Sequence, residues 1–178
     1  DLSGKIIKGD GEINYTGYVI HGAIHQARAD INCVMHTHSR AGLAISCLRD
    51  GLNPMIQDSA MFYKRVSYHD WEGMSTNTDE CQRLINSLGV KNVMILRNHG
   101  LLTCGTTIGQ AFMLMYYLDR ACKNQIDVLS MNKKFILPSK KIMDHAASQY
   151  DNQEYELGKN EWPALLRRLD KNKSIYKD

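Results

Sequence analysis

Long hydrophobic runs are missing from this chain of 178 residues. No apolar segment approaches the roughly 20 residues that a membrane helix needs, and no signal-peptide pattern opens the sequence. Internal repeats and low-complexity segments are also missing. Hydrophobic residues make up 43% and charged residues 23% of the chain, as in an ordinary globular protein. This length can form one domain with a substantial core but is short for two domains.

A strong excess of charge of one sign is lacking as well. The formal net charge is +3, and the Lys and Arg residues are scattered with a basic bias only near the C-terminus. This distribution lacks the cluster of basic residues that is typical of nucleic-acid-binding proteins. The five cysteines form no CxxC pair, and four lie within apolar or helical runs. We therefore expect free, buried thiols in a reducing cytoplasm rather than disulfides.

Two histidines follow a short apolar segment of β-branched character, residues 33–35. Side chains on a strand alternate between its faces, so His36 and His38 should point the same way. Two imidazoles at this spacing can hold one metal ion, although such a pair also occurs without metal. A second buried-strand run, residues 93–96, also leads to a histidine, His99. Two strands that end in histidines at a common sheet edge would form a three-histidine site with an open coordination position.

Three segments around these histidines resemble the class II aldolase/adducin family, with a similarity that spans residues 1–130. They read VIHGAIHQARADINCVMHTHSRAGLAIS, YHDWEG and MILRNHGLLTCG. In the zinc aldolases of this family, the HxH pair and the histidine of NHG bind the ion. The resemblance therefore implies that His36, His38 and His99 hold Zn²⁺ or another divalent metal.

The same resemblance implies the architecture and the assembly. It indicates an α/β fold: a three-layer α/β/α domain with a mainly antiparallel central sheet. Alternating strands and helices alone would instead have suggested a parallel sheet. Family members form tetramers with sites near subunit contacts, so we expect a cytoplasmic homotetramer with a small-molecule substrate.

The resemblance is weaker where the aldolases carry out proton transfer. Those enzymes have Ser-Ser-Glu ahead of the helix that precedes the HxH strand, whereas residues 15–17 here read Tyr-Thr-Gly. Gly17 cannot move a proton, and only Thr16 keeps a hydroxyl that could contact a phosphate. Asp58 or Tyr63 could serve only if their loop folded over the site. The catalytic base is therefore unknown from the sequence.

Two functions remain open. The pattern Asn-x-x-Gly-aromatic-x-Ile-His at residues 14–21 looks more like the adducin-related branch than the sugar-phosphate aldolases. Adducin uses this fold as a head domain in actin–spectrin assembly without known aldolase chemistry, so the fold does not settle the function. One hypothesis is a metal-dependent lyase for a small carbonyl or sugar-phosphate-type substrate. The alternative is a non-catalytic, adducin-like binding or assembly module, although a long basic tail of the adducin kind is lacking.

Helix signals flank the predicted metal site. Thr16 is a suitable N-cap for a helix to about residue 28, and Ser39 for a second helix to about residue 49. Free N–H groups at the second helix start would favour an anionic ligand, which makes Ser39 and Arg40 candidate substrate contacts, with a plain N-cap and a surface arginine as the alternative. The resemblance to the aldolases adds the Thr16 hydroxyl as a second substrate contact. His21 and His25 lie four residues apart, but Gly22 stands where an HExxH site has its general base. We expect this pair to pack in the core or form hydrogen bonds.

The rest of the chain is divided by further signals. Short extended segments are expected at 5–7, 12–14, 55–60, 65–68, 92–96 and 101–103, and helices at 76–88, 108–129 and 142–150. We assign residues 1–131 to the class II aldolase/adducin-like domain, and 132–178 to a linker, a short helix and a docking segment. The first residues resemble an interior strand and turn of the family. This indicates a fragment, a processed product or a naturally short relative that lacks the N-terminal part of the domain.

Overall fold

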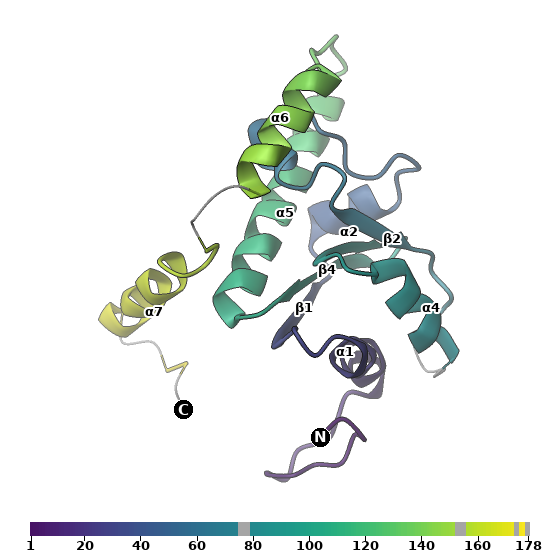
Figure 1. Ribbon diagram of the computed structural model, residues 1–178, viewed down its shortest axis with the longest axis vertical. Coiled ribbons are helices and arrows are strands. Elements are labelled where there is room, and N and C mark those ends of the chain that lie inside the picture. Colours follow the sequence, from purple (N-terminus) through teal and green to yellow (C-terminus); the bar gives the residue numbers. More distant parts are fainter. Residues whose placement is uncertain (75–78, 152–155, 173–174, 177–178) are drawn as a thin grey trace.

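The computed structural model describes residues 1–74, 79–151, 156–172 and 175–176 (Figure 1). Its elements run in the order α1 Tyr15–Ala27, β1 Cys33–Thr37, α2 Arg40–Ser46, α3 Gln57–Ala60, β2 Val66–His69, α4 Asp79–Leu88, β3 Val93–Leu96, β4 Gly100–Gly105, α5 Ile108–Ser130, α6 Lys140–Asp151 and α7 Glu161–Lys171. Among the described residues, no helix combines the length and the apolar character that a membrane crossing requires. The expected opening of α4 at residues 76–78 lies outside the described residues.

The four strands form one mixed sheet in the order β1-β4-β3-β2. Strand β4 pairs antiparallel with both β1 and β3, whereas β2 and β3 are parallel. Helix α4 lies between β2 and β3 in the chain, and a parallel pair needs such a crossover. The expected, mainly antiparallel sheet is therefore confirmed, with one parallel pair at its edge.

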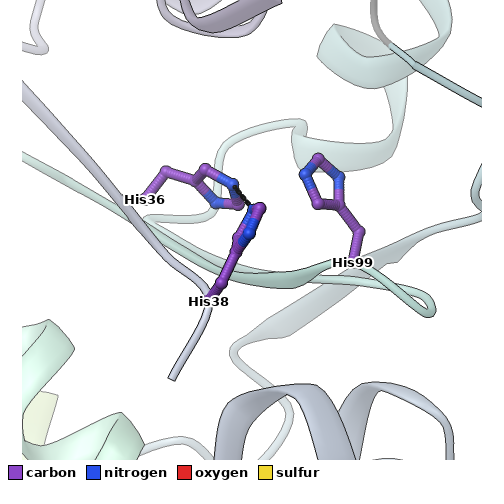
Figure 2. Close-up of side chains that lie close together, drawn as sticks. All are labelled: His36, His38 and His99. Atoms are coloured by element: carbon purple, nitrogen blue, oxygen red, sulfur yellow. Dashed lines mark hydrogen bonds between the residues drawn. The ribbon is translucent and has the colours of Figure 1, made fainter. Parts of the chain in front are cut away.

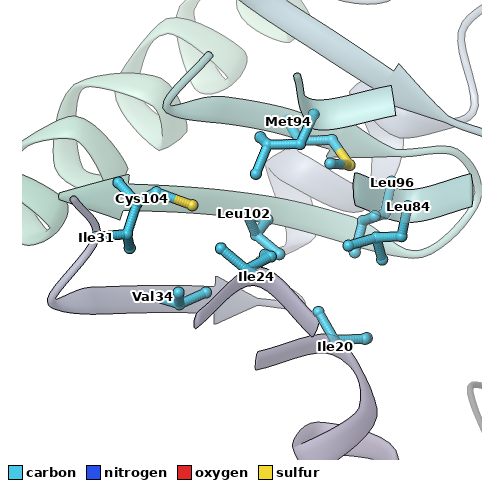
Figure 3. Close-up of a cluster of buried hydrophobic side chains, with 10 residues drawn as sticks. Ile20, Ile24, Ile31, Val34, Leu84, Met94, Leu96, Leu102 and Cys104 are labelled. Atoms are coloured by element: carbon cyan, nitrogen blue, oxygen red, sulfur yellow. The ribbon is translucent and has the colours of Figure 1, made fainter. Parts of the chain in front are cut away.

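Both faces of the sheet are covered, which makes the fold the expected three-layer α/β/α sandwich. On one face, residues of β3 and β4 pack against α1 and α4; this cluster contains Ile20, Ile24, Ile31, Val34, Leu84, Leu88, Met94, Leu96, Leu102 and Cys104 (Figure 3). On the other face, alternate residues Val93, Ile95 and Leu101 pack against α2 and α5. This two-sided burial explains why β3 and β4 are apolar at almost every position.

Helix α2 lies unusually close to β4. A Cβ atom added at Gly42 would lie 2.5 Å from Cγ of Leu101. The small residue Gly42 thus allows close packing here, and Ile45 of the same helix is fully buried. Each fully buried side chain of this size stabilises the fold by about 1.5–3 kcal/mol. The helix ends at Ser46, three residues earlier than expected.

One local prediction at the N-terminal end of the chain was wrong. The N-cap of α1 is Asn14 rather than Thr16: the Asn14 side-chain oxygen accepts from the Gly17 N–H at 3.3 Å and from the Thr16 hydroxyl at 2.8 Å. Two cap-forming residues lie two positions apart, and the sequence alone did not decide between them. The segments 5–7 and 12–14, expected to be extended, contain no helix and do not join the sheet.

Residues 55–60 were expected to be extended, but the structure has the short helix α3 there. The Ser59 hydroxyl donates to the carbonyl of Ile56 at 2.7 Å, and the Ile56 N–H donates to the Ser59 hydroxyl at 3.0 Å. This local side-chain to backbone bonding closes a helical turn that the apolar pattern does not indicate.

The C-terminal helices pack on the main body through polar and aromatic contacts. Arg65 forms an ion pair with Asp151 of α6 at 2.7 Å and donates to a carbonyl of the same helix. Helix α7 lies on α5, where the rings of Phe112 and Trp162 are 5.3 Å apart. Trp162 of the terminal segment thus lies against α5 of the main body.

Candidate metal centre

Three histidines from two neighbouring loop–strand junctions converge at one edge of the sheet (Figure 2). His36 lies near the end of β1, His38 directly follows that strand, and His99 lies in the turn between β3 and β4. Because β1 and β4 are antiparallel, with Thr37 opposite Leu101, the end of β1 lies beside this turn. The sequence placed these rings at a common edge, and the pairing of β1 with β4 supplies the reason.

The three rings are close enough to share one ion. Their centroids are 4.7, 4.8 and 4.9 Å apart, and one nitrogen from each ring lies within 4.8 Å of the others. Tetrahedral zinc with Zn–N bonds of about 2.0–2.1 Å requires nitrogens roughly 3.3 Å apart. Small ring rotations reach that spacing, so the donor set fits a divalent cation.

The hydrogen bonds of His36 fix which of its nitrogens faces the other rings. Its Nδ1 lies 2.9 Å from the carbonyl oxygen of Leu101, which can only accept, so Nδ1 carries the proton. The lone pair of Nε2 is therefore directed at His38, whose own Nε2 lies 2.8 Å away. Two such nitrogens at this distance need a shared proton or a cation between them. A carbonyl behind a metal-binding histidine is the usual arrangement that orients the ring.

Burial keeps two of these imidazoles in the neutral form that binds metal. The pKa of His36 is lowered to about 4, chiefly by desolvation and also by the neighbouring His99 and His38, while the hydrogen bond with the Leu101 carbonyl opposes the shift. Desolvation also lowers the pKa of His99, with His38 as the second cause. At neutral pH both rings are uncharged, so a cation meets lone pairs rather than positive charge.

Gly100 allows the strands to approach beneath the histidines. Its φ is +155°, and a Cβ atom there would lie 2.4 Å from the carbonyl oxygen of Thr37. Any residue with a Cβ atom at this position would force β4 away from the end of β1 and separate the histidine rings. The NHG motif therefore needs its glycine for a steric reason as well as its histidine for a chemical one.

Arg97 and Asn98 hold the turn that carries His99, a role that the sequence analysis did not assign. The Arg97 guanidinium donates to the carbonyls of Leu48 at 2.5 Å and Arg49 at 3.1 Å and lies 4.2 Å from the centre of the Tyr68 ring. Asn98 has a φ of +54°, which asparagine tolerates better than most residues. The asparagine of the NHG motif, Asn98, was the signal in the sequence for a residue with a left-handed backbone conformation.

The histidines open into a cavity of about 440 Å³. Its remaining walls come from the start of α1, from α2 and from the segment after β2; they are Asn14, Thr16, Gly17, Ile20, Leu43, Trp71, Gly73, Met74 and Asn98. Thr16 therefore lies where a substrate-side hydroxyl was expected. Ser39 does not line this cavity, and its hydroxyl accepts from the Gly42 N–H at 3.1 Å as the N-cap of α2.

No carboxylate is among the described residues that line the histidine cavity. Asp58 lines a separate cavity of about 650 Å³ beside α5 and α6, and its carboxylate pairs with Arg120 at 2.8 Å. Tyr63 lines a third hollow, also without the histidines. The loop that carries these two residues does not fold over the site. At Gly17, by contrast, a Cβ atom would meet nothing closer than 3.9 Å, so the cavity has room for a side chain there.

The other histidine pair behaves as expected for a structural one. His25 Nδ1 lies 3.2 Å from the carbonyl of Ile31, which ties α1 to the loop before β1. His21 is half-buried, and desolvation lowers its pKa, with His25 as a second cause. Neither joins the three-histidine group of the described residues.

Known proteins share this fold and much of this sequence. The family model of the class II aldolase and adducin N-terminal domain matches residues 1–126. The crystal structure of an aldolase II superfamily protein from Pseudomonas syringae is 41% identical, with a TM-score of 0.93 over 100% of this chain and 72% of that chain.

More distant relatives carry both kinds of name found in the family. An L-fuculose 1-phosphate aldolase from Glaciozyma antarctica is 30% identical, with a TM-score of 0.72 over 84% of this chain and 58% of that chain. An adducin-related protein from Schizosaccharomyces pombe is 33% identical over 93% of this chain and 53% of its own length. The family match covers more than two thirds of the residues and includes all three histidines. The chain therefore belongs to the class II aldolase and adducin family.

Proposed function

We propose that this chain is a class II aldolase-like, metal-dependent lyase that acts on a small carbonyl or sugar-phosphate-type substrate. The observation that carries the proposal is the convergence of three imidazoles, with nitrogens within 4.8 Å, at the wall of an open cavity. His36, His38 and His99 would hold Zn²⁺ or another divalent ion. Such an ion supplies Lewis-acid polarisation of a substrate carbonyl and stabilises the negative charge that develops on C–C cleavage.

The protein's own groups contribute orientation and a binding surface. The Leu101 carbonyl holds the His36 ring through Nδ1, and neutral imidazoles leave the charge of the ion available to the substrate. Across the cavity, the start of α1 lines the wall with Thr16, whose hydroxyl donates to the Asn14 side chain at 2.8 Å, and a helix start suits an anionic substrate group. This opposition of a cation site and an anion-binding helix start favours a phosphorylated or carboxylated carbonyl compound.

A second function is favoured by one observation, the lack of a carboxylate among the described residues of the cavity wall. Gly17 stands where the aldolases have their catalytic Glu, so the chain as described has no identified base. An adducin-like binding or assembly module would need the fold and a structural ion but no proton shuttle. The adducin-related name of one relative is consistent with this alternative.

Metal content is the first test. We expect purified protein to contain one zinc or other divalent ion per chain by elemental analysis, and His36→Ala and His99→Ala to lose it while circular dichroism stays unchanged. His145→Ala, on the exposed surface of α6, is the matched control. Protein that takes up no ion from a metal-supplemented buffer would contradict the proposed centre.

Turnover separates the two functions. Aldehyde release from a panel of ketose 1-phosphates, measured with a coupled dehydrogenase, should appear with the metal-loaded protein and disappear in His99→Ala. Metal-loaded protein without turnover on any substrate would favour the assembly module instead. As in the family, we propose a cytoplasmic homotetramer, and light scattering tests the assembly.

A further inference from the structure

The connection between α5 and α6 forms an exposed apolar tip at one end of the molecule (Figure 1). Helix α5 has 23 residues and ends at Ser130, where Asn132, with a φ of +48°, turns the chain. The following side chains face solvent: Ile136 is 93% exposed, Leu137 53% and Phe135 46%. Three consecutive large apolar residues without cover are unusual on a protein surface and indicate a binding site.

Lysines surround these apolar side chains on both sides. Lys133 and Lys134 precede them, Lys140 and Lys141 follow them, and all four are exposed. Residues 128–143 contain no Asp or Glu. Within the described part of the chain, none of the four lysines forms an ion pair, and the nearest downstream acid, Asp144, pairs with Lys64. The tip, residues 131–141, is therefore basic and apolar at once.

We propose that this tip docks the protein on an anionic lipid surface. A short apolar segment enters the boundary between headgroups and acyl chains, and flanking lysines bind anionic headgroups; neither signal is strong alone. A protruding tip needs no preformed pocket in a fluid surface. A second copy of this chain is a poorer partner, because its net charge is +3 and it offers no excess of acid to four lysines.

The proposal is independent of the histidine cavity, which none of the tip residues lines. The N-terminal segment lies at the opposite end of the molecule (Figure 1) and offers a matched control. There, Lys5, Ile7 and Lys8 are also exposed, but Asp10 and Glu12 follow closely in the sequence. Equal changes in charge and apolar surface can therefore be compared at the two ends of one molecule.

The test is flotation of the full chain with vesicles of pure phosphatidylcholine or of equimolar phosphatidylserine and phosphatidylcholine. We expect binding only to the anionic vesicles, decreasing as salt is added. One lysine near such a surface is worth about a fivefold change in partitioning, so Lys133→Gln with Lys134→Gln should weaken binding roughly 30-fold. Ile136→Ser should weaken it about tenfold or more.

The control variants Lys5→Gln with Lys8→Gln, and Ile7→Ser, should bind as the unmodified protein does. No flotation of the unmodified protein, or an equal loss in the tip and control variants, would overturn the proposal. Light scattering on the same samples gives the other decisive result. If Ile136→Ser lowers the oligomer mass and the unmodified protein does not bind the vesicles, the tip is a contact between copies of this chain.

Discussion

The two walls of the histidine cavity are built differently. The sheet-edge wall is held by close contacts: the Leu101 carbonyl on His36, the Arg97 guanidinium on the carbonyls that follow α2, and a glycine where no Cβ fits. The α1 wall has a single side-chain cap at Asn14 and open space at Gly17. One wall is fixed for binding an ion, whereas the other can accept new side chains. Under the proposed function, the groups that would hold a metal ion and the group that would transfer a proton therefore belong to different walls.

The largest difference in stability between the two walls should appear when one methyl group is added to each of them. Gly100→Ala places a Cβ 2.4 Å from the Thr37 carbonyl and should cost about 3 kcal/mol in the free energy of unfolding, with loss of metal. Gly17→Ala meets only distant atoms in a helix and should stabilise by about 0.5–1 kcal/mol. Urea unfolding measures both. Equal effects would remove the distinction between the walls.

The next prediction gives the α1 wall the group that it lacks. Gly17→Glu places a carboxylate in the cavity at the first turn of α1, and a positioned general base typically contributes about 10²-fold or more. Aldehyde release by the metal-loaded variant should therefore rise by about that factor on a responsive substrate. Gly17→Gln, which has the same size without the acid, is the control. If both variants are equally inactive while metal is bound, the assembly module is the better description.

A smaller effect is expected from loosening the support behind His99. Arg97→Gln removes the donors to the Leu48 and Arg49 carbonyls and the stacking on Tyr68. Changes in such supporting groups typically weaken metal affinity by about 10–100-fold. Competition with a zinc chelator measures this affinity. Arg49→Gln changes an exposed neighbour and should leave it unaltered; an equal loss there would indicate a general charge effect.

The smallest effect is the pH dependence of stability in chelator-treated protein. His36 has a folded pKa of about 4 against 6.5 for an ordinary histidine, so the unfolded chain takes up its proton first. Stability should therefore fall as the pH drops from about 6.5 towards 4. His36→Gln should flatten this dependence by on the order of 1 kcal/mol, because partial exposure screens the effect.

Urea midpoints at pH 7 and pH 5 measure this difference. His145→Gln, an exposed histidine on α6, provides the same chemical change away from the site. If the stability of both the His36 and the His145 variant changes with pH as that of the unmodified protein does, then burial of His36 does not lower its pKa.

Several elements were readable from the chain because a local signal was sufficient. The apolar runs before His36 and His99 became β1 and β3, and Ser39 caps α2 as expected. Other elements were misjudged because a local hydrogen bond decided them. Asn14 rather than Thr16 caps α1, and a serine–backbone pair makes residues 57–60 helical.

The sequence alone determined the family and the three-layer fold through its resemblance to that family. It also supplied the three candidate ligands, because the strand pattern and the histidine spacing are local properties of the chain. Only the tertiary structure decided which wall each residue joins. It removed Asp58, Tyr63 and Ser39 from the cavity lining, retained Thr16, and added Arg97, Asn98 and Gly100 as supports of the histidines. These outcomes depend on how α1, α2 and the β3–β4 turn pack around the end of β1. Contacts between residues so distant in the chain leave no periodic signal in it.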